Sequence, residues 1–216
     1  MVDPIYLTNY NRTDNELEEV LIWGLLVAGK NGLVTAKLLD SFLKDYSHIG
    51  DSPFEIFSRF QLDNIPRLSV ALKDYGFGCY NNKARWLYEL VRSGVNLRTC
   101  TIDDLEKFNG IGMKTSRLFV LHTRKDVVCI PLDVHMLHYL KDSGYNVPKS
   151  TPGNKKNKKK YLTIEKLCIQ LARRDGMSCA DWDLAIWNRY RSRNIKVEKN
   201  AGGTKSYWAQ FPGKAI

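Results

Sequence analysis

Apolar residues recur along most of this chain at spacings of three and four positions, which is the period of an amphipathic helix. The pattern predicts a first helix over residues 16–28, with Thr13 as its N-cap. It predicts further helices over residues 34–46, 53–60, 65–75, 82–92, 103–108, 114–124, 134–140, 162–174 and 180–191. Strand-like alternation is nearly absent, and the extended apolar run at 127–132 is too isolated to form a sheet. We therefore expect an all-α helical bundle.

A glycine-containing turn separates two of these helices. Thr101 is the expected N-cap of the first, with Asp104 at the third helical position of a capping box. The turn itself consists of Asn109, Gly110, Ile111 and Gly112, with Ile111 expected to pack inward. The second helix begins directly afterwards, and the N–H groups and positive dipole at its start favour an anion. The alternative is an ordinary corner between two helices.

Two residues close to this turn have the chemistry of a reactive site. Lys114 lies at the start of the second helix, where the positive helix end disfavours an ammonium and favours a nucleophilic neutral amine. Its alternative role is simple pairing with a phosphate. Asp133 follows the apolar run at 127–132 and is the expected N-cap of the next helix. A fixed carboxylate could stabilise positive charge on a sugar, although an isolated capping aspartate is often only structural.

At these residues the chain resembles the helix-hairpin-helix DNA glycosylases of the endonuclease III superfamily. That family carries an L-P-G-x-G-x-K-T-A hairpin and a downstream V-D-T-H, and this chain reads FNGIGMKTS at 108–116 and LDVH at 132–135. An earlier segment, GFGCYNNKA at 76–84, is similar to the family's G-x-Y-x-x-K-A. The similarity covers residues 17 to about 193.

The resemblance implies a fold, an activity and a set of site residues. It implies two helical lobes with a catalytic cleft between them: a barrel lobe at 31–132, and a second lobe from 1–30 plus 133–216. Lys114 would be the Schiff-base nucleophile and Asp133 the catalytic carboxylate, and family members with this lysine usually also nick the strand by β-elimination. The expected DNA contacts are Asn109, Gly110, Gly112, Thr115, Lys30, Asn31 and Lys83, and the candidates for the base pocket are Phe77 and Tyr80.

Several positions depart from the family pattern. Asn109 replaces the usual proline, and Met113 replaces the hairpin arginine. Gly29-Lys30-Asn31-Gly32 replaces a Gln-containing loop that wedges into the base stack, so Lys30 or Asn31 is the expected wedge. Relatives with an iron–sulfur cluster hold it with four clustered cysteines. The cysteines here are scattered at Cys79, Cys100, Cys129, Cys168 and Cys179, so we expect no cluster.

The composition favours a polyanionic partner. With 33 basic and 23 acidic residues among 216, the formal net charge is +10. The chain contains no run of eighteen apolar residues, which a membrane-spanning helix would need, and its first residues do not resemble a signal peptide. Five cysteines without framework spacing suggest free thiols in a reducing compartment. We expect a monomer that acts on double-stranded DNA inside the cell, in the cytoplasm, nucleoid or nucleus, without an organic cofactor or a bound metal, although the hairpin is a candidate site for a monovalent cation.

Two basic segments complete the picture. Residues 150–160 read STPGNKKNKKK, which we expect to be a mobile loop that either contacts the DNA backbone or serves only as a solvated linker. The tail at 194–216 contains Tyr207, Trp208 and Phe211, whose role the sequence does not decide. The sequence as a whole favours a base-excision DNA glycosylase with AP lyase activity. The alternatives are a non-catalytic helix-hairpin-helix DNA-binding protein and a glycosylase for an enzymatically modified base.

Overall fold

The structure, a computed structural model, describes residues 1–60, 64–153 and 155–191. Every regular element in these ranges is a helix, which confirms the expected all-α class. The chain divides into two compact units, residues 1–127 and residues 128–216. The aromatic residues of the tail, Tyr207, Trp208 and Phe211, lie outside the described ranges.

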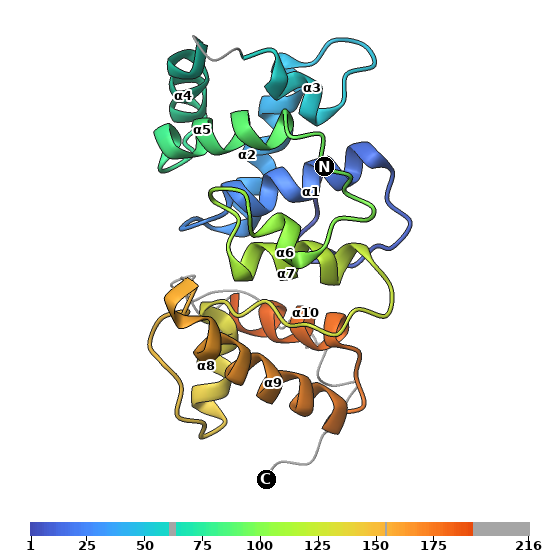
Figure 1. Ribbon diagram of the computed structural model, residues 1–216, viewed down its shortest axis with the longest axis vertical. Helices are drawn as coiled ribbons and strands as arrows, with labels where there is room; N and C mark the ends of the chain where they lie inside the picture. The colour runs from blue at the N-terminus through green and yellow to red at the C-terminus, as the bar shows by residue number, and fades with distance from the viewer. Residues whose placement is uncertain (61–63, 154, 192–216) are drawn as a thin grey trace, which may run out of the picture. The chain divides into compact units, whose positions relative to one another are not determined.

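Unit 1 is built around its first helix (Figure 1). Its helices are α1 (Asp14–Leu26), α2 (Gly32–Tyr46), α3 (Pro53–Ser58), α4 (Ile65–Asp74), α5 (Tyr80–Val91), α6 (Ile102–Leu105) and α7 (Met113–Thr123). In α1, Leu17 and every residue from Val20 to Leu26 are buried, and the helix contacts α2, α3, α5 and α7. A helix that is apolar on all sides must be covered on all sides, which explains its central position.

The position of α1 differs from the expected division of the chain. We had expected residues 1–30 to join the second lobe, whereas the structure groups α1 with α2–α7 in unit 1. The physical reason is close packing against α7: a β-carbon on Gly24 of α1 would lie only 3.2 Å from Cγ2 of Thr115. The division at 127–128 also falls slightly before the boundary expected at 132.

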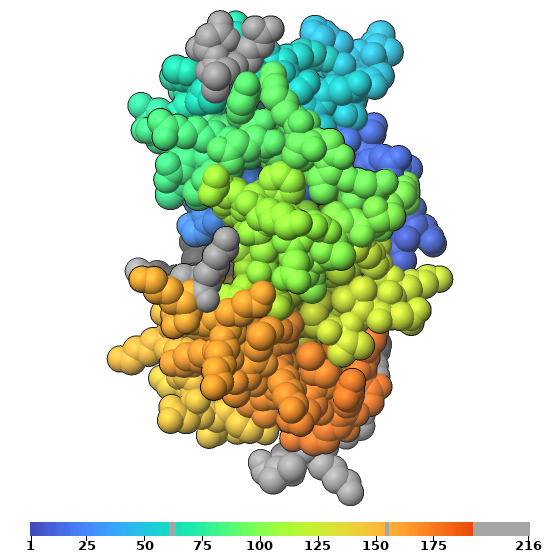
Figure 2. All heavy atoms as spheres, viewed as in Figure 1, coloured from blue at the N-terminus to red at the C-terminus, as the bar shows by residue number. Residues whose placement is uncertain are grey.

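The helix starts agree with the local capping signals. Thr13 accepts a hydrogen bond from the Glu16 amide in a reciprocal capping box, and Thr101 forms the same arrangement with Asp104. At Ser52 a third capping box starts α3, with Pro53 in its first turn. In the space-filling view the segment from α5 through α6, coloured green, is at the surface of unit 1 (Figure 2).

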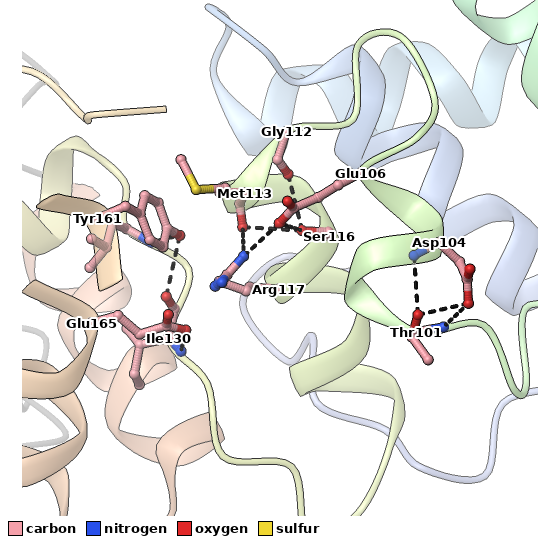
Figure 3. A network of polar contacts seen from close by, with 11 residues as sticks. Thr101, Asp104, Glu106, Gly112, Met113, Ser116, Arg117, Ile130, Tyr161 and Glu165 are labelled. Carbon is pink, nitrogen blue, oxygen red and sulfur yellow. Dashed lines mark hydrogen bonds and ion pairs between the residues drawn. The ribbon is translucent and has the colours of Figure 1, made fainter. Parts of the chain in front are cut away.

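Unit 2 contains α8 (Val134–Asp142), a 3₁₀ turn η2 (Lys155–Asn157), α9 (Lys158–Arg174) and α10 (Cys179–Tyr190). An extended segment at 129–132 is buried and leads directly into α8. Two side chains of α9 satisfy its backbone. Glu165 accepts from the Ile130 N–H at 3.0 Å (Figure 3). The Tyr161 hydroxyl accepts from the Leu132 N–H at 2.8 Å. These bonds replace the sheet partners that an extended strand would otherwise need.

The basic segment at 150–160 is more ordered than its composition suggested. We expected a mobile loop throughout, but Lys155–Asn157 form η2, and Lys158, Lys159 and Lys160 form the first turn of α9. Lysine is a good helix former, and the next residue, Tyr161, is fully buried and anchors the turn. The lysines therefore extend a packed helix by one turn.

Candidate functional site

The turn between α6 and α7 depends on a contact with α5. Gly110 has φ of 82°, and a β-carbon placed on it would lie 2.4 Å from Cε3 of Trp86. Only glycine therefore fits, both because of the left-handed backbone and because the indole occupies the space. Next to it, Asn109 is exposed and its amide donates to Glu89 of α5 at 3.0 Å. Ile111 is 3% exposed, as its expected inward packing requires.

A buried ion pair joins the two helices on either side of the turn. The Arg117 guanidinium lies 2.7 Å from the Glu106 carboxylate, with the two side chains only 6% and 13% exposed (Figure 3). Arg117 also donates to the Met113 carbonyl at 3.2 Å, and the Ser116 hydroxyl donates to Glu106 at 3.2 Å. These bonds fix the first turn of α7 relative to the end of α6.

Lys114 is the second residue of α7 and is half-buried. The N-cap of this helix is Gly112, which provides no side-chain hydrogen bond to the first turn. An uncapped first turn leaves backbone N–H groups and the positive dipole end for an external anion. The local geometry is therefore suited to a phosphate group, with Lys114 at the second position of the helix.

Two expected DNA contacts are instead part of the core. Thr115 is 8% exposed and packs against Gly24 of α1. Lys83 has no exposed surface, and its amine donates to the Leu26 carbonyl at 2.6 Å and the Ala28 carbonyl at 3.4 Å. Lys83 thus satisfies carbonyls at the C-terminal end of α1, where a cation is favoured. Neither side chain presents atoms to a DNA backbone, so we correct both assignments.

The two candidates for the base pocket differ in position. Phe77 is 2% exposed and meets Phe42 edge to face at 6.4 Å between ring centroids, so it belongs to the core of unit 1 rather than to a pocket. Tyr80, the first residue of α5, is half-buried, and the Lys73 amine lies 5.9 Å above its ring. Tyr80 therefore remains a candidate for contact with an extruded base.

The expected wedge residues are exposed in the turn between α1 and α2. Asn31 is the N-cap of α2, and its side chain accepts from the Leu33 and Val34 amides at 3.0 and 3.1 Å. Lys30 extends across Gly78, where a β-carbon would lie 2.5 Å from its Cε. Asn31 is engaged in capping, so Lys30 is the residue of the two with a side chain available for insertion.

In unit 2, Asp133 occupies the start of α8 as expected. Its carboxylate accepts from the Met136 N–H at 2.9 Å, and it is only partly exposed. The buried segment that precedes it is held by Tyr161, whose hydroxyl also donates to the Ile130 carbonyl at 3.3 Å (Figure 3). The Asp133 carboxylate is therefore held at the end of a hydrogen-bonded, buried segment, and part of the Asp133 side chain remains exposed to solvent.

Three supporting residues were not among the residues expected at the site: Trp86, Glu106 and Arg117. Each acts through a partner that is distant in sequence, and helical periodicity alone does not identify such partners. One usable signal was Arg117 itself, because it directly precedes the apolar residues Leu118 to Leu121, which the sequence places on a buried face. A buried arginine in such a position requires a carboxylate partner.

Other potential sites are limited. Within the described ranges no three His, Cys, Asp or Glu side chains gather as metal ligands would. All five cysteines are free thiols, and only Cys79 is exposed. Burial raises the pKa of Cys100, Cys168 and Cys179. No described helix has the length and apolar character that a membrane crossing needs.

The fold is similar to that of solved DNA glycosylases, although no protein-family model matches the sequence. The 8-oxoguanine DNA glycosylase of Thermotoga maritima is 22% identical with a TM-score of 0.60, covering 82% of this chain and 80% of that chain. The Methanocaldococcus jannaschii 8-oxoguanine DNA glycosylase is 20% identical with a TM-score of 0.62, covering 89% and 85%.

One of the solved structures with a similar fold is a complex with DNA. The M. jannaschii 8-oxoguanine glycosylase/lyase bound to a 15mer containing 8-oxoguanine is 22% identical with a TM-score of 0.60, covering 88% of this chain and 86% of that chain. The chain therefore has the all-helical fold of 8-oxoguanine DNA glycosylases over most of its length.

Proposed function

We propose that this protein is a base-excision DNA glycosylase with an associated lyase activity, and that Lys114 is its nucleophile. The observation that carries the proposal is the uncapped start of α7, where Lys114 follows a glycine turn that Trp86 and the Glu106–Arg117 pair hold in place. The fold shared with glycosylases and the net charge of +10 support the same conclusion.

The chemistry follows from the two side chains. The turn and the first N–H groups of α7 bind a backbone phosphate, and the target base leaves the stack. The Lys114 amine attacks C1′ of the deoxyribose and gives up a proton, the N-glycosidic bond breaks, and the base departs with the bonding electrons and takes up a proton. The Asp133 carboxylate stabilises the positive charge that develops on the sugar.

The covalent sugar then permits strand scission. Ring opening converts the adduct to an imine between the Lys114 nitrogen and C1′, which makes a proton on C2′ acidic. Loss of this proton expels the 3′ phosphate by β-elimination, and water hydrolyses the imine to release the enzyme. Lysine and water supply every group in this sequence, so the proposed reaction needs no metal or organic cofactor.

The first substrate to test is 8-oxoguanine, because the similar solved structures are glycosylases for this base. A panel of duplexes, each with one damaged, mismatched or enzymatically modified base, would be incubated with the protein. Released base would be measured separately from strand nicking. We expect 8-oxoguanine to be released, while a product from a different duplex alone would reassign the substrate. No release from any duplex would support the non-catalytic DNA-binding alternative.

Borohydride trapping tests the nucleophile. Reduction of the imine during turnover should leave a stable protein–DNA adduct with the natural chain, and Lys114→Ala should abolish it. Lys107→Ala is a matched control, because Lys107 lies on the other side of the turn and pairs with Asp104. Undiminished trapping in Lys114→Ala would move the nucleophile to another amine, such as Lys30.

A further inference from the structure

Unit 1 contains a polar cavity of about 220 Å³ at the opposite end of α7 from the glycine turn. Three arginines line it, Arg12, Arg98 and Arg124, and no carboxylate is among its described lining residues. The rest of the lining consists of Tyr10, Leu17, Leu97 and Thr123. The volume far exceeds the roughly 10–15 Å³ that a single water molecule requires.

Backbone carbonyls hold the arginines in place. Arg12 donates to the Leu7 carbonyl at 2.8 Å, and Arg124 donates to the Leu97 carbonyl at 3.0 Å. Arg98 donates to the Arg12 carbonyl at 3.2 Å. The segment that precedes α1 is itself fixed to α7, because the Asn9 N–H donates to the His122 carbonyl at 3.0 Å. The guanidinium groups are therefore preorganised around the cavity.

Two guanidinium groups keep an unused donor. The Nε atoms of Arg12 and Arg124 are both buried and have no hydrogen-bond partner within the described structure. A buried N–H without a partner is costly, and two on residues that line one cavity call for an acceptor inside it. Water could accept these hydrogen bonds, but a compact anion would also balance the positive charge of the arginines.

The nearby carboxylates neutralise the cluster only in part. Asp14 pairs with Arg98 at 2.7 Å in an exposed ion pair, which leaves Arg12 and Arg124 without a carboxylate at ion-pair distance within the described structure, and Glu16 is engaged with Thr13 in the capping box of α1. Burial lowers the pKa of Arg12 in spite of the opposing effects of Glu16 and Glu19. The desolvation of Arg12 thus outweighs its local compensation, which is the condition under which a bound anion is stabilising.

We propose that this cavity binds a compact phosphate group, as a phosphate monoester or inorganic phosphate, at a site separate from the glycine turn. Arginine is the side chain best suited to tetrahedral oxyanions, because its donors lie in a planar fork. The 11 residues of α7 separate the two ends of that helix by ~16 Å, so one phosphate cannot occupy both sites. The proposal is independent of the glycosylase activity.

The direct test follows the unused donors by NMR. The full chain, labelled with ¹⁵N, would be titrated with inorganic phosphate at constant ionic strength, with chloride as the reference anion. The Nε–Hε signals of Arg12 and Arg124 should shift in a saturable manner. If neither signal moves at phosphate concentrations above roughly 10 mM, as expected of a cavity that holds only water, the proposal is wrong.

Variants locate the binding. Arg124→Gln removes the charge and the Nε donor, and should weaken phosphate binding by roughly tenfold or more. Lys125→Gln is the matched control, because it removes one exposed positive charge at the next position outside the lining. Equal weakening in both variants would show only a general charge effect and would overturn the site. Since Arg124→Gln also loses its bond to Leu97, folding would be checked by circular dichroism, and Arg98→Gln provides a second variant.

A second titration, with DNA, distinguishes a phosphate monoester on DNA from inorganic phosphate. Undamaged duplexes with and without a 5′ phosphate would be titrated against the same arginine signals. A shift that requires the terminal phosphate, and that inorganic phosphate competes away, assigns the cavity to a phosphate monoester on DNA. A shift with inorganic phosphate alone assigns it to a free anion. No shift in either arm rejects the proposal.

Discussion

The indole of Trp86 lies so close to Gly110 that a β-carbon on the glycine would stand 2.4 Å from Cε3 of the ring. The turn that we propose to bind phosphate is therefore shaped by a side chain of α5 as much as by its own glycines. We expect Gly110→Ala to lower the free energy of unfolding by about 2–4 kcal/mol, because it combines left-handed strain with overpacking.

Gly94→Ala is the matched control for this substitution. Gly94 also has positive φ, at 67°, but nothing lies within 4 Å of its β-carbon position. Both variants would be measured by urea denaturation. Gly94→Ala should lower the free energy of unfolding only by the backbone strain, about 1–2 kcal/mol. The double variant Gly110→Ala/Trp86→Ala should recover the overpacking part. Strictly additive effects would mean that the indole does not constrain the turn.

Asp133→Asn separates the two roles of the residue at the start of α8. Asparagine is as good an N-cap as aspartate, so the bond to the Met136 amide and the fold should survive. The negative charge is lost, and base release in single-turnover assays should fall on the order of 10²-fold with unchanged DNA affinity. Asp133→Ala should in addition lower stability by about 1 kcal/mol. Near-normal base release in the Asn variant would reduce Asp133 to a structural cap.

The Tyr161 hydroxyl supports the same carboxylate indirectly. Tyr161→Phe leaves the buried N–H of Leu132 without its acceptor at 2.8 Å, which should cost about 1–3 kcal/mol. Because Leu132 directly precedes Asp133, the rate of base release should fall while duplex affinity changes little. Thr163→Ala on the same helix removes an exposed hydroxyl bond to the Lys159 carbonyl and serves as the control. Equal effects of the two variants would argue against a positioning role for Tyr161.

Local signals in the sequence predicted the helices and their starts but not what each side chain touches. Thr13, Thr101 and Asp133 cap their helices as expected, because a cap depends only on residues within one turn. Thr115 and Lys83 were expected on the surface, yet both are buried. Their positions depend on α1, which supplies the space at Gly24 and the carbonyls at its C-terminal end.

The candidate site shows the same limit. Lys114 was placed correctly at the start of a helix, since the glycine turn and the apolar spacing after it are local features. The Glu106–Arg117 pair and the arginine cavity were not anticipated, because their members come from segments that only the tertiary fold brings together. Long-range electrostatic partners of this kind leave no periodic pattern in a single sequence.

Buried Lys83 should make stability depend on pH. Burial lowers the pKa of its amine below the ordinary value of 10.5, so the folded state resists protonation more than the unfolded state does. Between the lowered pKa and 10.5 the unfolded chain binds more protons, and stability rises with pH. The free energy of unfolding of the natural chain, minus that of Lys83→Met, should therefore increase as pH rises through this window. A pH-independent difference in denaturation experiments would show that burial does not perturb the amine.

The lysines in the first turn of α9 should contribute to DNA binding through charge alone. Lys158, Lys159 and Lys160 are exposed, and they precede the buried Tyr161 and the exposed Leu162. Replacing all three with Gln retains helix propensity, so the fold should persist. Binding to every duplex should weaken alike, and each lost phosphate contact should reduce the slope of log K against log salt by roughly 0.9. Lys166→Gln, one exposed charge further along α9, should leave the slope nearly unchanged. An unchanged slope in the triple variant would make the turn a solvated surface, and a loss confined to one base would indicate direct recognition instead.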